Sequence, residues 1–299
     1  MKVLRVPFWV TSCLVVRSVE AFYGVPSSCA TRHDASSVWR NILGASSPAS
    51  SYYNNAPPAF QDPALENFRQ GSVPLVCLDH AVRPDQVEAW KQDAMALQSL
   101  AFGATAGVAS RHADIRSGVH QVWLQSPLAA PPPFLVGNLD ARKELLQWVE
   151  GLRVSLHDDH VDGLRSLPPE LIELSYLIYN DQGAAYAKHV DSFANDADRK
   201  RCVSFLLYLG SADDDNRPWD CQRDGGALRI HDQPYCAATG RAMVDSDDDA
   251  SWSDITPHAG TLVLFDSATV PHEVIMTKRS RVCIVGWLGT YAKASATSE

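Results

Sequence analysis

Two histidines and one aspartate in the C-terminal half have the types and spacing of a metal site. One residue separates His189 from Asp191, and in a β-strand residues i and i+2 point to the same face. A third ligand must come from elsewhere, and His272 lies in a segment flanked by expected strands. Two histidines and one carboxylate on one side of a metal leave its other positions open, which is typical of non-haem Fe(II) sites that activate oxygen. A His-x-Asp pair alone is a common chance pattern, and a lone histidine is more often structural than a ligand.

Arg281 follows His272 by nine residues and begins the apolar segment Arg281–Trp287. A charged group at the start of a buried strand needs a partner, and a guanidinium can form two parallel hydrogen bonds to a carboxylate. Strand alternation places Arg281, Cys283, Val285 and Trp287 on one face. If that face lines the interior of a barrel, Arg281 points at the metal pocket. The alternative is a structural salt bridge or a surface arginine at a strand end.

Two amphipathic helices are expected outside a sheet. Pro84 begins the first and Asp140 caps the second. Apolar residues recur at helical spacing in both, so we interpret them as core. The expected core positions are Val87, Trp90, Ala94 and Leu97 in the first helix and Leu145, Val149, Leu152 and Leu156 in the second.

After residue 170 the pattern changes to short strands separated by turn residues. No helical pattern between them is long enough for parallel βαβ units, so an antiparallel sandwich or barrel is favoured. An earlier strand is expected at Val73–Leu78. The later ones are expected at Glu173–Tyr179, Cys202–Leu209, Gly226–His231, Thr261–Phe265 and Arg281–Trp287.

Two polar insertions interrupt this series, at Ala212–Pro218 and Ala237–Ser253. The second contains an aspartate cluster whose spacing does not match an EF-hand, which favours a solvated loop over a calcium site. No Cys-x-x-Cys pair is present, so a zinc ribbon is not indicated. Cys221–Cys236 is the first pair to test for a disulfide.

The N-terminus has the pattern of a targeting segment. Lys2 and Arg5 precede a short apolar run that cannot span a bilayer, and Ala21–Phe22 offers a cleavage site that is similar to those of plastid leaders. We predict a leader at 1–21, a linker at 22–59, one domain at 60–290 and a tail at 291–299. The expected compartment is the secretory pathway, the ER lumen or a plastid. It is the cytoplasm if residues 6–16 instead form a buried strand.

Composition limits the partners. The net charge is −9, whereas nucleic-acid binding favours stripes of lysine and arginine, so we expect no nucleic-acid partner. No segment after the leader is apolar for long enough to form a membrane helix, so no stable membrane insertion is expected after its removal.

The types and order of its motifs along the sequence make the chain resemble the prolyl 4-hydroxylase family of Fe(II)/2-oxoglutarate-dependent dioxygenases. It is most similar to the oxygen-sensing branch, because collagen-type relatives usually carry lysine where Arg281 stands. The resemblance covers roughly residues 70–290. The motifs that carry it are Asp114-Ile115-Arg116 with Val122-Trp123, Tyr179 with Tyr186-x-x-His189-Val190-Asp191, Cys202-Val203 with Tyr208-Leu209, Gly225-Gly226-Ala227-Leu228-Arg229-Ile230, and Pro271-His272-Glu273-Val274 with Arg281 and Trp287.

The resemblance implies a mainly β domain with flanking helices, built as a double-stranded β-helix (jelly-roll) barrel. It implies that His189, Asp191 and His272 bind Fe(II) and that Arg281 pairs with the distal carboxylate of 2-oxoglutarate. Tyr208 would add a hydrogen bond to that carboxylate, and Tyr179 would lie near the co-substrate or the entry side. Leu228 and Trp287 would line the pocket wall. The alternative for Tyr179, Tyr186 and Tyr208 is that they are ordinary sheet aromatics.

The implied reaction uses O2 and 2-oxoglutarate to hydroxylate a proline in a peptide or protein, with release of succinate and CO2. L-Ascorbate is implied as the iron reductant. Three alternatives stay open: the same chemistry on a non-prolyl side chain, on a small molecule, or a catalytically silent metal-binding barrel. The intact Arg281 and Tyr208 argue against the last, since a metal store needs no carboxylate clamp.

Overall fold

A computed structural model describes most of the chain after residue 57. The predicted leader, most of the linker, the end of the tail and much of both insertions lie outside the described residues, so those expectations stay predictions. The described residues are 58–105, 116–126, 132, 135–156, 170–192, 199–213, 217–232, 235–236, 241–242 and 251–291.

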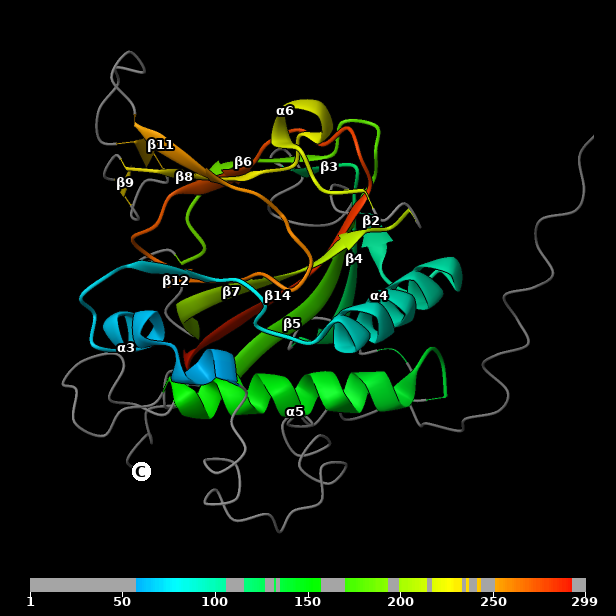
Figure 1. Cartoon of the computed structure of the whole chain (residues 1–299), viewed down its shortest axis with the longest axis horizontal. Helices are drawn as coiled ribbons and strands as arrows, with labels where there is room; N and C mark the ends of the chain where they lie inside the picture. The colour runs from blue at the N-terminus through cyan, green and yellow to red at the C-terminus, as the bar shows by residue number, and fades with distance from the viewer. Residues whose placement is uncertain are drawn as a thin grey trace, which may run out of the picture.

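Two antiparallel sheets form the body of the domain and face each other, one above the other in Figure 1. We call the seven-stranded sheet the major sheet and the five-stranded one the minor sheet. In spatial order the major sheet comprises β1 (Leu75–Leu78), β12 (Leu262–Asp266), β7 (Arg199–Ser211), β14 (Arg281–Tyr291), β5 (Glu170–Tyr179), β4 (Val119–Gln125) and β2 (Ala104–Thr105). The minor sheet comprises β11 (Trp252–Ile255), β8 (Leu228–His231), β13 (His272–Val274), β6 (Ala185–His189) and β3 (Arg116–Ser117), and β9 (Tyr235–Cys236) pairs separately with β10 (Arg241–Ala242).

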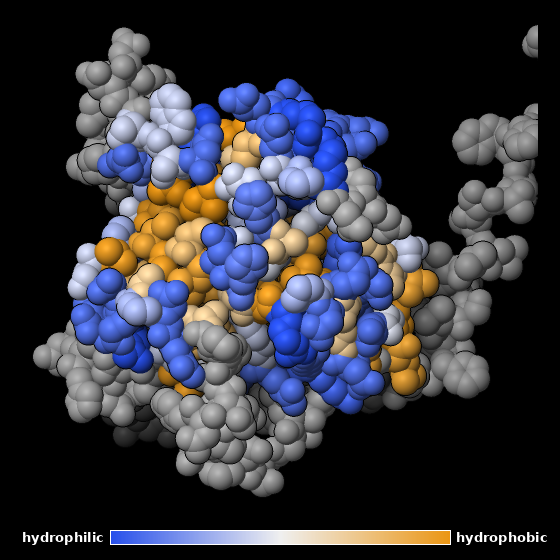
Figure 2. Space-filling model, in the orientation of Figure 1, coloured by the Kyte–Doolittle hydropathy of each residue, from blue (hydrophilic) through white to orange (hydrophobic). Residues whose placement is uncertain are grey.

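This arrangement is the expected jelly-roll double-stranded β-helix, and the fold prediction is confirmed. Neighbouring strands in each sheet come from distant parts of the chain, as in the order β12-β7-β14-β5. Closing the two sheets over each other buries one face of each. Figure 2 shows hydrophobic residues reaching the surface between the two sheets, whereas hydrophilic residues cover the region around α6 (Cys221–Asp224).

Helices cover the outer face of the major sheet (Figure 1). They are η1 (Pro58–Gln61), α3 (Pro63–Arg69), α4 (Pro84–Ser99) and α5 (Leu139–Ser155). The core positions expected on α4 and α5, together with Leu156, are all buried, and Pro84 begins α4 as expected. The expected cap of α5 was wrong by two residues. Asn138 caps it, because its side chain accepts a hydrogen bond from the Ala141 amide at 3.1 Å, while Asp140 lies in the first turn.

A buried ion pair joins the helices to the sheet. Both the side chain of Asp93 on α4 and that of Arg142 on α5 are almost fully buried. The Asp93 carboxylate accepts from Arg142 Nε at 3.0 Å and Nη2 at 2.8 Å, and from the hydroxyl of Tyr176 on β5 at 3.1 Å. The Asn138 amide also donates to it at 2.6 Å, so four donor groups from Arg142, Tyr176 and Asn138 meet at one carboxylate.

Strand alternation separates two cores. On β14, Val282 and Ile284 pack toward the helices, while Cys283, Val285 and Trp287 pack toward the minor sheet. The predicted inward face of this strand is thus present. Between the sheets it forms part of an inner core, defined as Val119, Leu177, Tyr179, Ala184, Tyr186, Leu206, Tyr208, Leu228, Ile230, Val263, Phe265, Val270, Val274, Cys283, Val285 and Trp287.

The suggested disulfide between Cys221 and Cys236 is wrong. Cys221 is a free thiol, and its Sγ contacts the Thr256 hydroxyl at 3.3 Å. The thiol at the start of α6 has a hydroxyl partner instead.

Among the described residues, no helix has the length and apolar character needed to span a membrane.

Candidate metal centre

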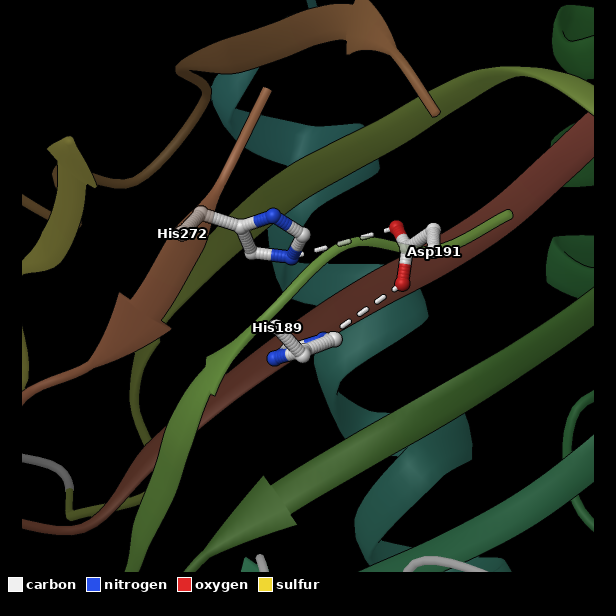
Figure 3. Close-up of side chains that lie close together, drawn as sticks. All are labelled: His189, Asp191 and His272. Atoms are coloured by element: carbon white, nitrogen blue, oxygen red, sulfur yellow. Dashed lines mark ion pairs between the residues drawn. The ribbon is translucent and has the colours of Figure 1, made fainter. Parts of the chain in front are cut away.

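His189, Asp191 and His272 come together next to the inner-core residues Tyr186 and Phe265. His189 ends β6 and His272 begins β13, and the two are register partners across the minor sheet. Asp191 follows β6 by two residues. One side-chain ligand atom from each residue lies within 4.8 Å of the others, and all three residues are buried (Figure 3). The strand pairing brings together two residues that are 83 positions apart in the chain.

Both imidazoles present Nε2 to this cluster. The Nδ1 of His189 lies 2.8 Å from the Ala187 carbonyl, and the Nδ1 of His272 lies 3.0 Å from the Val270 carbonyl. A carbonyl only accepts hydrogen bonds, so each Nδ1 carries a proton, and Nε2 is the nitrogen left to bind a metal. Asp191 faces both Nε2 atoms, with Oδ1 3.4 Å from that of His189 and Oδ2 3.8 Å from that of His272.

The protonation states also suit a cation. Burial, together with the neighbouring His189, lowers the pKa of His272 to about 4, so this imidazole is neutral at physiological pH. Burial alone would raise the pKa of the Asp191 carboxyl, but His272, His189 and Arg201 lower it well below its usual range. Two imidazole nitrogens and one carboxylate oxygen in a buried position form a donor set that Fe(II) accepts.

The inner core also contains buried hydrogen-bond donors that lack an acceptor. Among the described residues, Nε and Nη2 of Arg281 and the hydroxyl of Tyr208 have no hydrogen-bond partner. Arg281 is 1% exposed, and its charge is not balanced there by a carboxylate in any ion pair of the described residues. Burial raises the pKa of the Tyr208 phenol above its usual range, against the opposing effect of Arg281, so Tyr208 stays a neutral donor.

The arginine itself is held firmly. Its Nη1 donates to the Gly226 carbonyl, and its guanidinium carbon lies 4.2 Å from the centre of the Tyr179 ring and 5.4 Å from that of Tyr208. Gly226 has φ +71°, and a Cβ there would lie 3.1 Å from the Trp219 ring, so the backbone of the double-glycine motif requires glycine at this position. Nη1 and the stacked face are therefore used by the protein, which leaves Nε and Nη2 for a ligand.

A buried guanidinium beside an unpaired phenol favours an anionic acceptor, because leaving both without partners would be costly. A carboxylate suits both donors, because a guanidinium and a phenol can each donate to its oxygens. Leu228 and Trp287, the remaining expected lining residues, both belong to the inner core. Trp287 Nε1 is also without a hydrogen-bond partner among the described residues.

Several residues around the site were not expected from the sequence. Ser204 donates to Asp191 Oδ2 at 2.6 Å, and Ser267 lies 2.8 Å from Ser204. Arg201 donates to the Asp191 carbonyl at 3.2 Å and to Glu173 at 2.6 Å, and it stacks on Trp287 at 4.1 Å. Alternation from Tyr208 would have placed Ser204 on the inward face, so that signal was present; Ser267 and Arg201 depend on contacts between distant segments.

Comparison with known proteins agrees with this site. Residues 174–289 match the family model for the 2OG-Fe(II) oxygenase superfamily, a span that includes His189, Asp191, His272 and Arg281. The chain therefore carries a 2OG-Fe(II) oxygenase domain, and the predicted enzyme class, a 2-oxoglutarate-dependent dioxygenase using Fe(II), is confirmed. A comparison with curated protein sequences gave no match.

Solved structures that share this fold include two prolyl hydroxylases and an epimerase. A Pseudomonas putida prolyl-4-hydroxylase is similar with 24% identity and a TM-score of 0.53, over 77% of this chain and 98% of that one. A Trichoplax adhaerens prolyl hydroxylase, solved with a peptide fragment of the hypoxia inducible factor oxygen degradation domain, shows 18% identity and a TM-score of 0.54, over 82% and 94%. The α-ketoglutarate-dependent epimerase SnoN of nogalamycin biosynthesis shows 13% identity and a TM-score of 0.53, over 81% and 88%. At these identities the likeness concerns the fold.

Proposed function

We propose that His189, Asp191 and His272 bind Fe(II), and that Arg281 and Tyr208 bind the distal carboxylate of 2-oxoglutarate. The observation that carries this proposal is the set of buried donors without partners, on Arg281 and Tyr208, in the same inner core as the His-Asp-His cluster. Tyr179 would hold the guanidinium in place, and Leu228 and Trp287 would line the pocket wall.

When bound, Fe(II) with 2-oxoglutarate and O2 supplies oxidative decarboxylation and hydroxylation of a C–H bond. The chain would contribute binding and orientation. Arg281 and Tyr208 would fix one end of the co-substrate, and the two imidazoles with the ionised Asp191 would hold the metal. The apolar inner core would exclude water from the reacting atoms.

We propose a proline in a peptide or protein as the substrate, hydroxylated with release of succinate and CO2. The fold likeness to prolyl hydroxylases supports it, as does the peptide complex of the Trichoplax protein. A small-molecule substrate is the second candidate, because the same fold carries an epimerase. L-Ascorbate as the iron reductant, and a secretory or plastid location given by the N-terminal leader, are proposals that rest on the sequence.

Mass spectrometry can test the substrate. The protein would be incubated with Fe(II), 2-oxoglutarate, ascorbate and a library of proline-containing peptides, with matched peptides carrying alanine in place of proline. We expect succinate and the gain of one oxygen atom on proline alone. If succinate forms while every peptide stays unmodified, the prolyl proposal is contradicted. Gain of the oxygen atom by a small molecule added to the same incubation would then support the second candidate.

A further inference from the structure

A chain of two serine hydroxyls holds the Asp191 carboxylate. Ser204 Oγ lies 2.6 Å from Asp191 Oδ2 and 2.8 Å from Ser267 Oγ, and both serines are fully buried. An ionised carboxylate can only accept, so Ser204 donates its single proton to Asp191. Ser204 must then accept from Ser267. The direction of both hydrogen bonds therefore follows from the charge on Asp191.

Ser267 also holds the backbone around the carboxylate. Its carbonyl accepts from the amides of Asp191 and Ser192, both at 2.9 Å, and its own amide donates to the Cys202 carbonyl at 3.1 Å. The segment after β6, the strand β7 and the turn after β12 thus meet at this residue. Asp191 is positioned through its main chain and its side chain at once.

Packing alone does not explain a serine at position 204. Ser204 lies on β7 between the register partners Phe265 on β12 and Trp287 on β14, both of which belong to the inner core. A buried hydroxyl is costly there unless it is hydrogen-bonded. Its bonds to Asp191 and Ser267 remove that cost, and alanine would fill nearly the same volume without them.

The two oxygens of Asp191 therefore differ. Oδ2 accepts from Ser204 and lies 3.8 Å from Nε2 of His272, while Oδ1 lies closer to an imidazole, 3.4 Å from Nε2 of His189. We propose that Ser204 is a positioning residue that reserves Oδ1 for the metal and prevents Asp191 from binding it through both oxygens. One-ended binding would keep the remaining positions of an octahedral site open for a chelating co-substrate and O2. This inference rests on the proposed metal centre.

Binding of Co(II), a spectroscopic substitute for Fe(II), can test it on the full chain without any turnover. Titration would give the affinity, and the visible absorption at saturation would report the coordination geometry. We expect Ser204→Ala to weaken Co(II) binding by about tenfold to a hundredfold, as is typical when a group that orients a metal ligand is lost, and to change the spectrum. Ser204→Thr, which keeps the hydroxyl, should retain both, and Ser267→Ala should show a smaller loss.

Thr261→Val is the matched control. Thr261 is also buried and donates to a carboxylate, Oδ1 of Asp79, at 2.8 Å, but neither residue belongs to the metal cluster. This variant should bind Co(II) like the wild type. Wild-type affinity and spectrum in a folded Ser204→Ala, confirmed by circular dichroism, would overturn the role of Ser204 and leave the metal centre intact. Failure of the wild-type chain to bind Co(II) would instead overturn the proposed metal centre, and this inference with it.

Discussion

The guanidinium carbon of Arg281 lies 4.2 Å from the centre of the Tyr179 ring, and the two residues are register partners on β14 and β5. The tyrosine face and the Gly226 carbonyl hold the arginine without using Nε and Nη2. A buried cation that is oriented in this way is preorganised to bind an anion. This arrangement gives the first prediction.

Arg281→Ala should raise the 2-oxoglutarate concentration needed for half-maximal succinate formation. A hydrogen bond to a charged group contributes about 1.5–3 kcal/mol, which corresponds to roughly a tenfold to hundredfold change. Arg229→Ala is the control, because Arg229 pairs with Asp254 at 2.8 Å in the minor sheet, away from the inner core. An unchanged requirement for 2-oxoglutarate in Arg281→Ala would exclude the carboxylate clamp.

Tyr208→Phe should weaken 2-oxoglutarate binding without destabilising the protein. It removes a buried hydroxyl that has no partner among the described residues, so only the ligand loses a hydrogen bond. Tyr176→Phe should destabilise the protein and leave 2-oxoglutarate binding unchanged. Its hydroxyl donates to Asp93 at 3.1 Å on the other side of the sheet. Calorimetric binding and thermal melts of both variants check this contrast, and equal effects of the two on binding would refute it.

Asp93→Asn should destabilise the fold by about 3–5 kcal/mol, because it leaves the buried Arg142 charge without a counterion. Urea unfolding measures the effect. Arg83→Ala is the comparison, since it removes an exposed ion pair with Glu144 between the same two helices. Similar losses of unfolding free energy in the two variants would contradict the larger cost assigned to breaking the buried Asp93–Arg142 pair.

Acidification should destabilise the metal-free protein through His272. Its folded pKa of about 4 lies below the ordinary value of 6.5, so the unfolded chain binds the proton more tightly. Stability from this group is complete above pH 6.5 and is lost as the pH falls toward 4. The unfolding free energy of the wild type should therefore fall relative to His272→Gln by about 2.5 kcal/mol between about pH 7.5 and about pH 4.5. A constant difference across this range would contradict a neutral buried His272.

The sequence predicted what depends on local periodicity. Alternation indicated the inward face of β14, and helical spacing indicated the buried faces of α4 and α5. Strand ends were predicted less well. β7 and β14 extend beyond the expected Cys202–Leu209 and Arg281–Trp287 because they pair with each other along most of their length, and pairing between distant strands is not visible in local composition.

The surroundings of the site show the same limit. His189 and Asp191 could be placed on one side because they are neighbours in the chain. The pairing of His272 with His189 needs the register of β13 against β6, and the contact of Ser204 with Ser267 needs that of β7 against β12. The resemblance to a family indicated that His272 joins His189 at the site, whereas the contact of Ser204 with Ser267 required the three-dimensional structure.

The most direct test of the proposed iron site compares succinate formation from 2-oxoglutarate by the wild type and by Asp191→Ala, each with Fe(II), O2 and the proline-peptide library. Asp191 supplies the single carboxylate of the cluster, so its loss should remove metal binding without disturbing the rest of the inner core. We predict Fe(II)-dependent succinate formation by the wild type and none above the metal-free background by a folded Asp191→Ala. Wild-type turnover in that variant, or no turnover by the wild type with any peptide or small molecule, would contradict the proposed site.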